Sequence, residues 1–215
     1  MDCLKISTLF AAGVLATATG AQAQDANRWF VKGGPAIIAL DENAKMYAAG
    51  NLVPGANVTI KPQGTIELEG GYFVTKNVAV ALTVGVPPLA KVEGAGTIAP
   101  LGTLGKAIYG PGTLTAEYHF NRDGKFQPYV GAGMAFLLIF HAEDGAISDL
   151  KATNDLGGAL QAGADYMFTP RTGVYVDFKQ TYLSTKTTGF LGPAPVVGQV
   201  RLNPAAYSVG FIRRF

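Results

Sequence analysis

Apolar and polar residues alternate along most of this chain. In TLTAEYHF (residues 113–120), every second residue from Leu114 to Phe120 is apolar, and Glu117 and His119 occupy intervening positions. VYVDFK (174–179) and AGADYMF (162–168) repeat the pattern. A period of two is the side-chain repeat of a β-strand, in which successive residues point to opposite faces. The pattern therefore predicts strands with one apolar and one more polar face.

Eight such segments follow one another, and most are as long as the roughly 9–11 residues that a tilted strand needs to cross a bilayer. They cover about residues 28–40, 63–73, 77–86, 112–120, 127–140, 155–168, 173–188 and 200–215. Short turns are predicted near 75–76, 121–124 and 169–172. Long loops rich in Gly, Pro and Ala are predicted at about 41–62, 87–111, 141–154 and 189–199, with one helical turn at Ile147–Lys151.

Short turns that alternate with long loops are typical of bacterial outer-membrane barrels. The predicted fold class is all-β: an eight-stranded antiparallel transmembrane β-barrel with short periplasmic turns and long extracellular loops. The predicted location is the outer membrane of a Gram-negative bacterium, with outer-membrane lipid as a partner. After residue 23 no run of 18 apolar residues occurs, which excludes transmembrane helices.

The uncharged stretch FQPYVGAGMAFLLIF (126–140) shows what the two faces of a strand would do. Its Gly-Ala-Gly centre is poor helix material. As a strand, one face carries the bulky residues Val130, Met134, Phe136, Leu138 and Phe140, which would meet lipid. The other face carries Gly131, Gly133 and Ala135, which suit the crowded interior of a narrow barrel. Further along the strand, Leu137 and Ile139 make this inner face apolar too.

The first residues predict an export signal. Lys5 precedes the apolar run ISTLFAAGVLATA, and Ala21-Gln22-Ala23 has the small-x-small form of a cleavage site. We expect a signal peptide at residues 1–23 and a mature barrel domain at 24–215; the alternative, a membrane anchor, is disfavoured because the apolar run is too short to span as a helix. Cys3, the only cysteine, lies in this segment, so the mature chain would have no disulfide and no thiolate chemistry.

Composition narrows the function classes further. A net charge of +2 without a basic run gives no indication of nucleic-acid binding. There is no nucleophile elbow, phosphate-binding loop or paired metal-ligand spacing, so we expect no enzyme activity, no cofactor and no metal site. The two histidines, His119 and His141, fall near opposite ends of the predicted barrel.

The predicted inward face divides into a charged lower half and an apolar upper half. With Phe215 placed outward, the lower lumen receives a polar network of Lys32, Glu67, Glu69, Glu117, His119, Asp165, Asp177, Lys179 and Arg214. The upper, hydrophobic lumen receives Ile38, Leu40, Leu137, Ile139, Thr181 and Leu202. An apolar lumen would stabilise a hydrophobic solute by about 25 cal/mol per Å² removed from water. Because the charged floor would block straight passage, such a solute would need a lateral exit.

Pro35 and Pro204 fall in the predicted first and last strands, which are neighbours in a closed barrel. A proline removes a ladder hydrogen bond, so this seam is a candidate lateral exit. The alternative is a bulge or loop-edge position with no transport role. Internal salt bridges that act only in stability, and an upper lumen that is simply packed, remain alternatives for the two halves of the lumen.

Three stretches resemble the OmpW family of eight-stranded outer-membrane proteins: FQPYVGAG (126–133), DLGGALQAGADY (155–166) and the ending from VRLNP (200–204) to Phe215. The resemblance implies a narrow channel with an apolar interior and passive uptake of small hydrophobic molecules. The aromatic C-terminus, Phe215, is the pattern expected for recognition by the outer-membrane insertion machinery. The ending FIRRF departs from the family's usual glycine, tyrosine, arginine and phenylalanine, and Thr181 stands where some members carry an inward tryptophan.

Two other functions remain open. A structural or surface-recognition barrel with a plugged lumen would bind phage, host tissue or antibodies through its long loops. A soluble, lipocalin-like secreted barrel would leave Phe136, Leu138 and Phe140 exposed as a patch if the small residues stayed inside.

Overall fold

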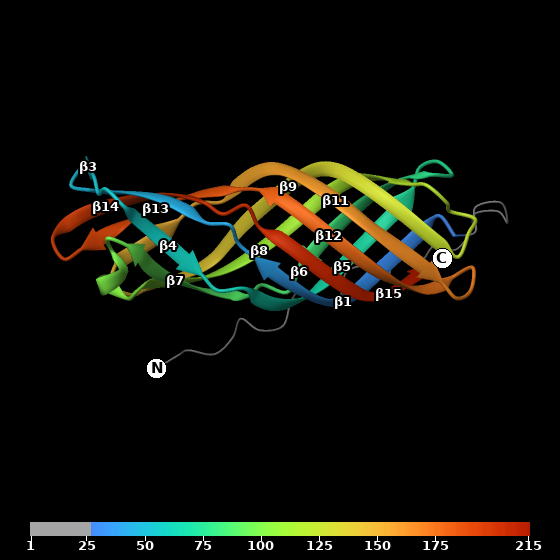
Figure 1. Cartoon of the computed structure of the whole chain (residues 1–215), viewed down its shortest axis with the longest axis horizontal. Coiled ribbons are helices and arrows are strands. Elements are labelled where there is room, and N and C mark those ends of the chain that lie inside the picture. The colour runs from blue at the N-terminus through green and yellow to red at the C-terminus, as the bar shows by residue number, and fades with distance from the viewer. Residues whose placement is uncertain (1–26) are drawn as a thin grey trace, which may run out of the picture.

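The computed structural model describes residues 27–215 as an elongated β-barrel (Figure 1). The predicted signal peptide, 1–23, lies outside the described residues. No helix within 27–215 is long and apolar enough to cross a membrane. The ordered segments are strands, apart from one short 3-10 helix, η1 (Ala99–Leu101).

Eight long strands close the barrel. In order around it they are β1 (Trp29–Ala39), β5 (Gln63–Phe73), β6 (Val78–Gly85), β8 (Thr103–His119), β9 (Phe126–Asp144), β11 (Asp155–Met167), β12 (Thr172–Tyr182) and β15 (Ala205–Arg214). Every neighbouring pair is antiparallel, and the pairings β8–β9 and β1–β15 complete the circle. The predicted fold class is therefore confirmed.

The alternation along β9 separates two surfaces as predicted. Ala135 and Leu137 are buried, whereas Met134 and Phe140 are each 59% exposed on the outer wall. On β15, Phe211 and Tyr207 also face outward. The outer side of the strands is thus apolar, whereas the inner side carries small and polar residues together with two buried apolar clusters.

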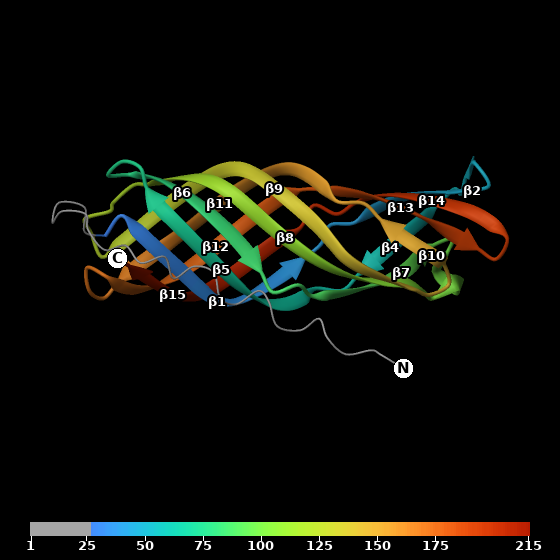
Figure 2. The ribbon, with the colours of Figure 1, turned by 180° about the vertical axis from the view of Figure 1, so that it is seen from behind.

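The prediction of long irregular loops is wrong. Much of the length of these segments forms strands that extend the barrel (Figures 1 and 2). These strands are β2 (Asn43–Ala48), β3 (Asn51–Leu52), β4 (Ala56–Ile60), β7 (Leu89–Gly96), β10 (Ser148–Ala152), β13 (Ser184–Leu191) and β14 (Ala194–Arg201). The helical turn expected at Ile147–Lys151 is also wrong: β10 covers most of it, and Asp149 has a positive φ of 51°. These segments are rich in Gly and Pro, which favour loops, and their period-two alternation, which favours strands, is weaker.

Two predicted strands each merge separate elements. The segment 173–188 breaks at Leu183 between β12 and β13, and 200–215 breaks at 202–204 between β14 and β15. The physical reason is a change of sheet. β12 pairs with β15 in the lower barrel, whereas β13 pairs with β14 in a second sheet of order β10-β13-β14-β2-β3.

The contact between the first and last strands is tight. The β1–β15 pairing keeps one register from Phe30↔Arg214 to Ala39↔Ala205. A Cβ atom at Gly34 would collide with the Val209 carbonyl and lie 2.7 Å from Gly210 Cα. Glycine at position 34 therefore lets the two backbones approach at the point where the barrel closes.

Candidate functional site: the lumen

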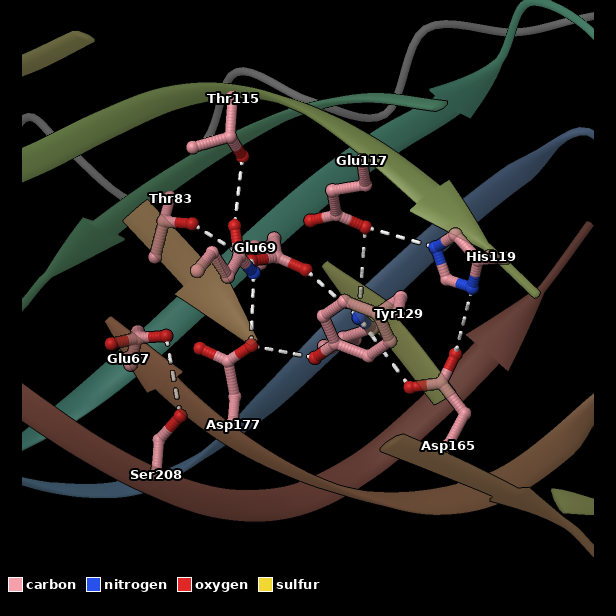
Figure 3. Close-up of polar contacts among 12 residues, drawn as sticks. Glu67, Glu69, Thr83, Thr115, Glu117, His119, Tyr129, Asp165, Asp177 and Ser208 are labelled. Atoms are coloured by element: carbon pink, nitrogen blue, oxygen red, sulfur yellow. Dashed lines mark hydrogen bonds and ion pairs between the residues drawn. The ribbon is translucent and has the colours of Figure 1, made fainter. Parts of the chain in front are cut away.

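The charged residues predicted for the lower lumen gather in one buried group, of which Figure 3 labels Glu67, Glu69, Glu117, His119, Asp165 and Asp177. We call Lys32, Glu67, Glu69, Glu117, His119, Asp165, Asp177, Lys179 and Arg214 the charge cluster. Each is less than 9% exposed, and they come from six of the eight barrel strands. Strand alternation brings them together because every member occupies an inward position.

Lys32 is at the centre of the charge cluster. Its Nζ lies 3.1 Å from Glu69 Oε1, 3.4 Å from Asp165 Oδ1 and 4.0 Å from Glu117 Oε2. The same atom lies 3.8 Å from the centre of the Tyr129 ring, within the range of a cation–π contact. One amine from β1 thus joins carboxylates from β5, β8 and β11.

Lys179 forms the second centre, towards the upper lumen. Its Nζ lies 2.8 Å from Glu67 Oε1, 3.1 Å from Glu69 Oε2 and 2.6 Å from Asp177 Oδ1. Glu69 therefore bridges the two lysines, one through each carboxylate oxygen. Such pairing meets the requirement that buried charges have partners.

Neutral groups complete the network. Gln161 Nε2 donates to Glu69 Oε2 at 3.1 Å and to Asp177 Oδ2 at 2.9 Å, while the Tyr129 hydroxyl donates to Asp177 Oδ2 at 2.6 Å. Thr83 Oγ1 donates to Glu69 Oε2 at 2.8 Å. With these bonds the charge cluster fills the cross-section of the lower lumen. Nothing in its chemistry suits an apolar solute.

A second layer of contacts lies below the charge cluster, at the periplasmic end. The Arg214 guanidinium donates to Gln127 Oε1 at 2.6 Å and lies 3.4 Å from Asp165 Oδ2. Arg122, on the β8–β9 turn, lies over the Phe73 ring at 3.8 Å and donates to the Asn27 carbonyl at 2.6 Å. The turn therefore folds under the barrel instead of away from it.

The upper lumen is apolar and contains space. A cavity of about 100 Å³ lies between the upper strands, and its walls include four of the predicted residues: Leu40, Leu137, Ile139 and Leu202. A smaller pocket of about 30 Å³ adjoins it above and shares Val58, Leu104 and Val200 as walls. For scale, an apolar cavity of about 150 Å³ can hold benzene.

The two remaining predicted residues lie one level lower. Ile38 and Thr181 line a pocket of about 40 Å³ where apolar side chains meet Glu67 and Lys179 of the charge cluster. Thr181 Oγ1 donates to the Pro204 carbonyl at 3.1 Å, so its hydroxyl is bound to backbone. Pro204 lines both this pocket and the 100 Å³ cavity above it.

The two prolines of the predicted seam lie at different heights of the barrel. Pro204 precedes β15 instead of lying within a strand, and its carbonyl also accepts a bond from the Thr181 amide at 2.9 Å. In the register of the β1–β15 pairing, Pro35 stands opposite Val209, about five residues from Pro204. The two prolines therefore do not face each other across one gap.

Sequence reasoning missed the part of the cavity that comes from the extracellular strands. Val58 and Ile60 on β4, and Ala90 and Val92 on β7, line it. The signal was present in ANVTI (56–60), where Ala56, Val58 and Ile60 alternate with polar residues. In the lower lumen, Gln161 and Tyr129 have the same inward parity as Asp165 and Gly131, but a neutral side chain at an inward position does not by itself indicate membership of a charged network.

Comparisons with known proteins agree with this architecture. The OmpW family model matches residues 25–215. The dibenzothiophene metabolism operon protein PahQ of Pseudomonas aeruginosa is 33% identical over 187 residues, which is 87% of this chain and 88% of PahQ. The outer membrane protein AlkL of Ectopseudomonas oleovorans is 33% identical over 170 residues, 79% of this chain and 74% of AlkL.

Two solved structures are similar in fold. The solid-state NMR structure of AlkL in DMPC bilayers has a TM-score of 0.69 and 28% identity, covering 94% of this chain and 97% of AlkL. The crystal structure of OprG from Pseudomonas aeruginosa has a TM-score of 0.82 and 23% identity, covering 89% and 97%. No catalytic family is indicated by the match. The family match also excludes a soluble, lipocalin-like barrel. This chain belongs to the OmpW family and is an outer-membrane β-barrel of a Gram-negative bacterium.

Proposed function

We propose that the barrel takes up small hydrophobic molecules passively through its apolar upper lumen. The observation that carries the proposal is a series of pockets in the upper lumen: two of about 30 and 100 Å³ above the charge cluster, and one of about 40 Å³ at its upper border. The names of its relatives AlkL and the dibenzothiophene operon protein PahQ support hydrocarbon-like solutes as the class.

The charge cluster sets where the path ends. To continue towards the periplasm, an apolar solute would have to separate Lys32 and Lys179 from their carboxylates. Leaving one buried charge without its partner costs about 3–5 kcal/mol, and a hydrocarbon offers no hydrogen bond in return. Lateral escape into the bilayer is cheaper, because the lipid is as apolar as the solute.

The wall between β6 and β8 is a better exit than the predicted proline seam. Their ladder ends at Val84↔Gly112, and the β7–β8 ladder begins at Leu89↔Ile108. Between them Pro111 has no amide hydrogen, and Gly85 and Gly112 have no side chains. All three line the 40 Å³ pocket at the bottom of the apolar path. The Phe136 ring packs over Gly112 from the neighbouring strand.

The test uses cells whose outer membrane is intact, so that the outer leaflet limits the entry of solute. A small aromatic hydrocarbon is supplied to a strain that lacks related barrels, and its oxidation by an excess cytoplasmic dioxygenase is measured. Ala90→Phe places a ring in the 100 Å³ cavity, since Ala90 is buried in its wall. The matched control is Ala132→Phe, at an exposed outward position on β9.

At equal surface amounts, we expect Ala90→Phe to reduce the initial rate towards that of cells without the barrel, and Ala132→Phe to retain the wild-type rate. If the wild-type barrel gave no more oxidation than its absence, the plugged, surface-recognition barrel would be the better function.

A further inference from the structure

Three cations lie close together on the outer wall of the extracellular extension. Lys45 on β2 and Lys186 on β13 flank Gln199 of β14 in one row across the sheet. Arg201 lies two residues further along β14, in the row of Ser184 and Asn43. All three side chains are exposed and point outward, because Ala44, Met46 and Val200 at alternate positions are buried. We call Lys45, Lys186 and Arg201 the basic patch.

The basic patch differs in its pairing from three other extracellular lysines. Lys91, Lys106 and Lys151 each have a carboxylate partner, Glu93, Glu143 and Asp149, at 2.9–3.2 Å. Within residues 27–215, no carboxylate lies within 4.0 Å of a basic-patch cation.

Two carboxylates border the basic patch. Asp155 already accepts from the Ser184 amide at 2.6 Å and from its hydroxyl at 3.2 Å. Asp41 is one row lower, where its amide donates to the Leu202 carbonyl. The patch therefore keeps a positive excess for a partner outside the chain.

The height of the basic patch on the barrel indicates which partner that is. Tyr182 ends β12 on the outer face, opposite Gly158 of β11, and is 51% exposed; Leu156, two residues further up β11, is 78% exposed. Aromatic residues mark the border between hydrocarbon and headgroups in such barrels. Ser184, and with it the row of Arg201, is only two residues above Tyr182, which is about 7 Å along a strand. Lys45 and Lys186 are one further row up, so the patch lies at headgroup level.

A groove of about 360 Å³ opens on the same outer wall below Arg201. Its lining includes Asp41, Gln180, Tyr182 and Asn203, a mixture of polar side chains and one aromatic ring. Such a surface suits a sugar more than an acyl chain. A phosphate above and a sugar below are the two parts of the phosphorylated glycolipid headgroup that forms the outer leaflet.

We propose that the basic patch binds the phosphates of the outer-leaflet glycolipid, lipopolysaccharide, with its sugar in the groove below. Arg201 would hold a phosphate through paired N–H groups, and the two lysines would add charge from either side of Gln199. The site fixes the barrel laterally among its lipids and does not depend on the uptake of solutes. It places the bound headgroup against the outer wall rather than in the lumen.

The test measures binding of bisphosphorylated lipid A to the purified mature protein in nanodiscs by native mass spectrometry. The variant Lys45→Gln/Lys186→Gln/Arg201→Gln removes the basic patch. The matched control Lys91→Gln/Lys106→Gln/Lys151→Gln removes the same charge from lysines with partners. All three proteins are first checked for equal thermal unfolding.

Each cation near a charged lipid surface is worth about a fivefold change in affinity, so we expect roughly a hundredfold loss in the patch variant. The control should bind nearly as wild type, and dephosphorylated lipid A should bind wild type as weakly as lipid A binds the patch variant. Equal affinity of patch variant and wild type would overturn the proposal. So would equal losses in both variants, or inorganic phosphate competing at the concentration of the lipid.

Discussion

Lys32 Nζ lies 3.8 Å above the centre of the Tyr129 ring, and both groups are almost completely buried in the lumen. The ring limits one side of the ammonium group, while Glu69 and Asp165 occupy others at 3.1 and 3.4 Å. An amine in this position has no access to bulk water. The surrounding carboxylates therefore stabilise the positive charge of Lys32, and Lys32 stabilises their negative charges.

Replacing Lys32 by methionine should destabilise the barrel strongly. The change keeps a side chain of similar length but leaves Glu69 and Asp165 without their shared cation. Removing one partner of a buried ion pair costs about 3–5 kcal/mol. Urea unfolding in lipid vesicles, followed by tryptophan fluorescence of Trp29, measures the difference.

The matched control is Lys76→Met. Lys76 pairs with Asp123 in the periplasmic turns, where both side chains are mostly exposed. A surface pair of this kind contributes no more than about 1 kcal/mol. If both variants lost the same free energy of unfolding, the charge cluster would not be the stabilising centre of the lower lumen.

Gly34 should be intolerant of any side chain. A Cβ atom there would meet the Val209 carbonyl and Gly210 Cα on β15, so Gly34→Ala should separate the strands that close the barrel. Gly70 on β5 has no atom within 4 Å of its would-be Cβ, which makes Gly70→Ala the control. The folded fraction, seen as the heat-sensitive band on a denaturing gel, should fall for position 34 alone. Equal folded fractions of both variants would show that the contact between β1 and β15 can accommodate a side chain at position 34.

Much of the fold and the lower site follows from side-chain parity. Period two in residues 113–120 and 174–179 determines both the strand and its inward face, so Glu117, His119, Asp177 and Lys179 could be placed together without a structure. The ion pairs that form within the charge cluster do not follow from parity. That Glu69 bridges Lys32 and Lys179 depends on the register between strands, which one sequence does not specify.

The upper site was harder to predict because its strands look like loops. Gly55, Gly96 and Pro54 interrupt the segments around β4 and β7, and two glycines there do adopt positive φ, 71° and 62°. These glycines lie in turns at the strand ends, and the rest of each segment is a regular strand. The sequence therefore predicts loops around Val58 and Val92, although both residues line the cavity.

Pro111→Ala should slow the lateral escape of solute. In strand β8 the Tyr109 amide donates to the Pro88 carbonyl. Residue 111 is two positions further along, so its amide would point to the same side, towards Gly85. Alanine supplies the missing donor and can close the gap in the wall. In the cellular oxidation assay, the rate should fall for Pro111→Ala and stay unchanged for Pro35→Ala; the reverse order would favour an exit between β1 and β15.

Asp144 should make the β9–β10 turn sensitive to acid. The amides of Asp149 and Leu150 donate to its carboxylate, each at 3.0 Å, and these bonds hold the pKa of Asp144 below its usual range. A lowered pKa means that the bonds are complete above about pH 4 and are lost only as the pH falls further. The amide proton shifts of Asp149 and Leu150 should then stay constant from pH 7 to about 4 and move together below it. Movement near neutral pH, or a wild-type profile in Asp144→Ala, would contradict this assignment.

The most direct test of the apolar path is to locate a bound solute by methyl NMR in nanodiscs. On titration with toluene, the methyl signals of Ala90, Leu137 and Ile139, which line the 100 Å³ cavity, should shift and saturate. Those of Ala132 and Leu138 on the outer face should change only in proportion to solute dissolved in the lipid. If the cavity methyls did not saturate, or followed the outer ones throughout, the upper lumen would be packing and not a path.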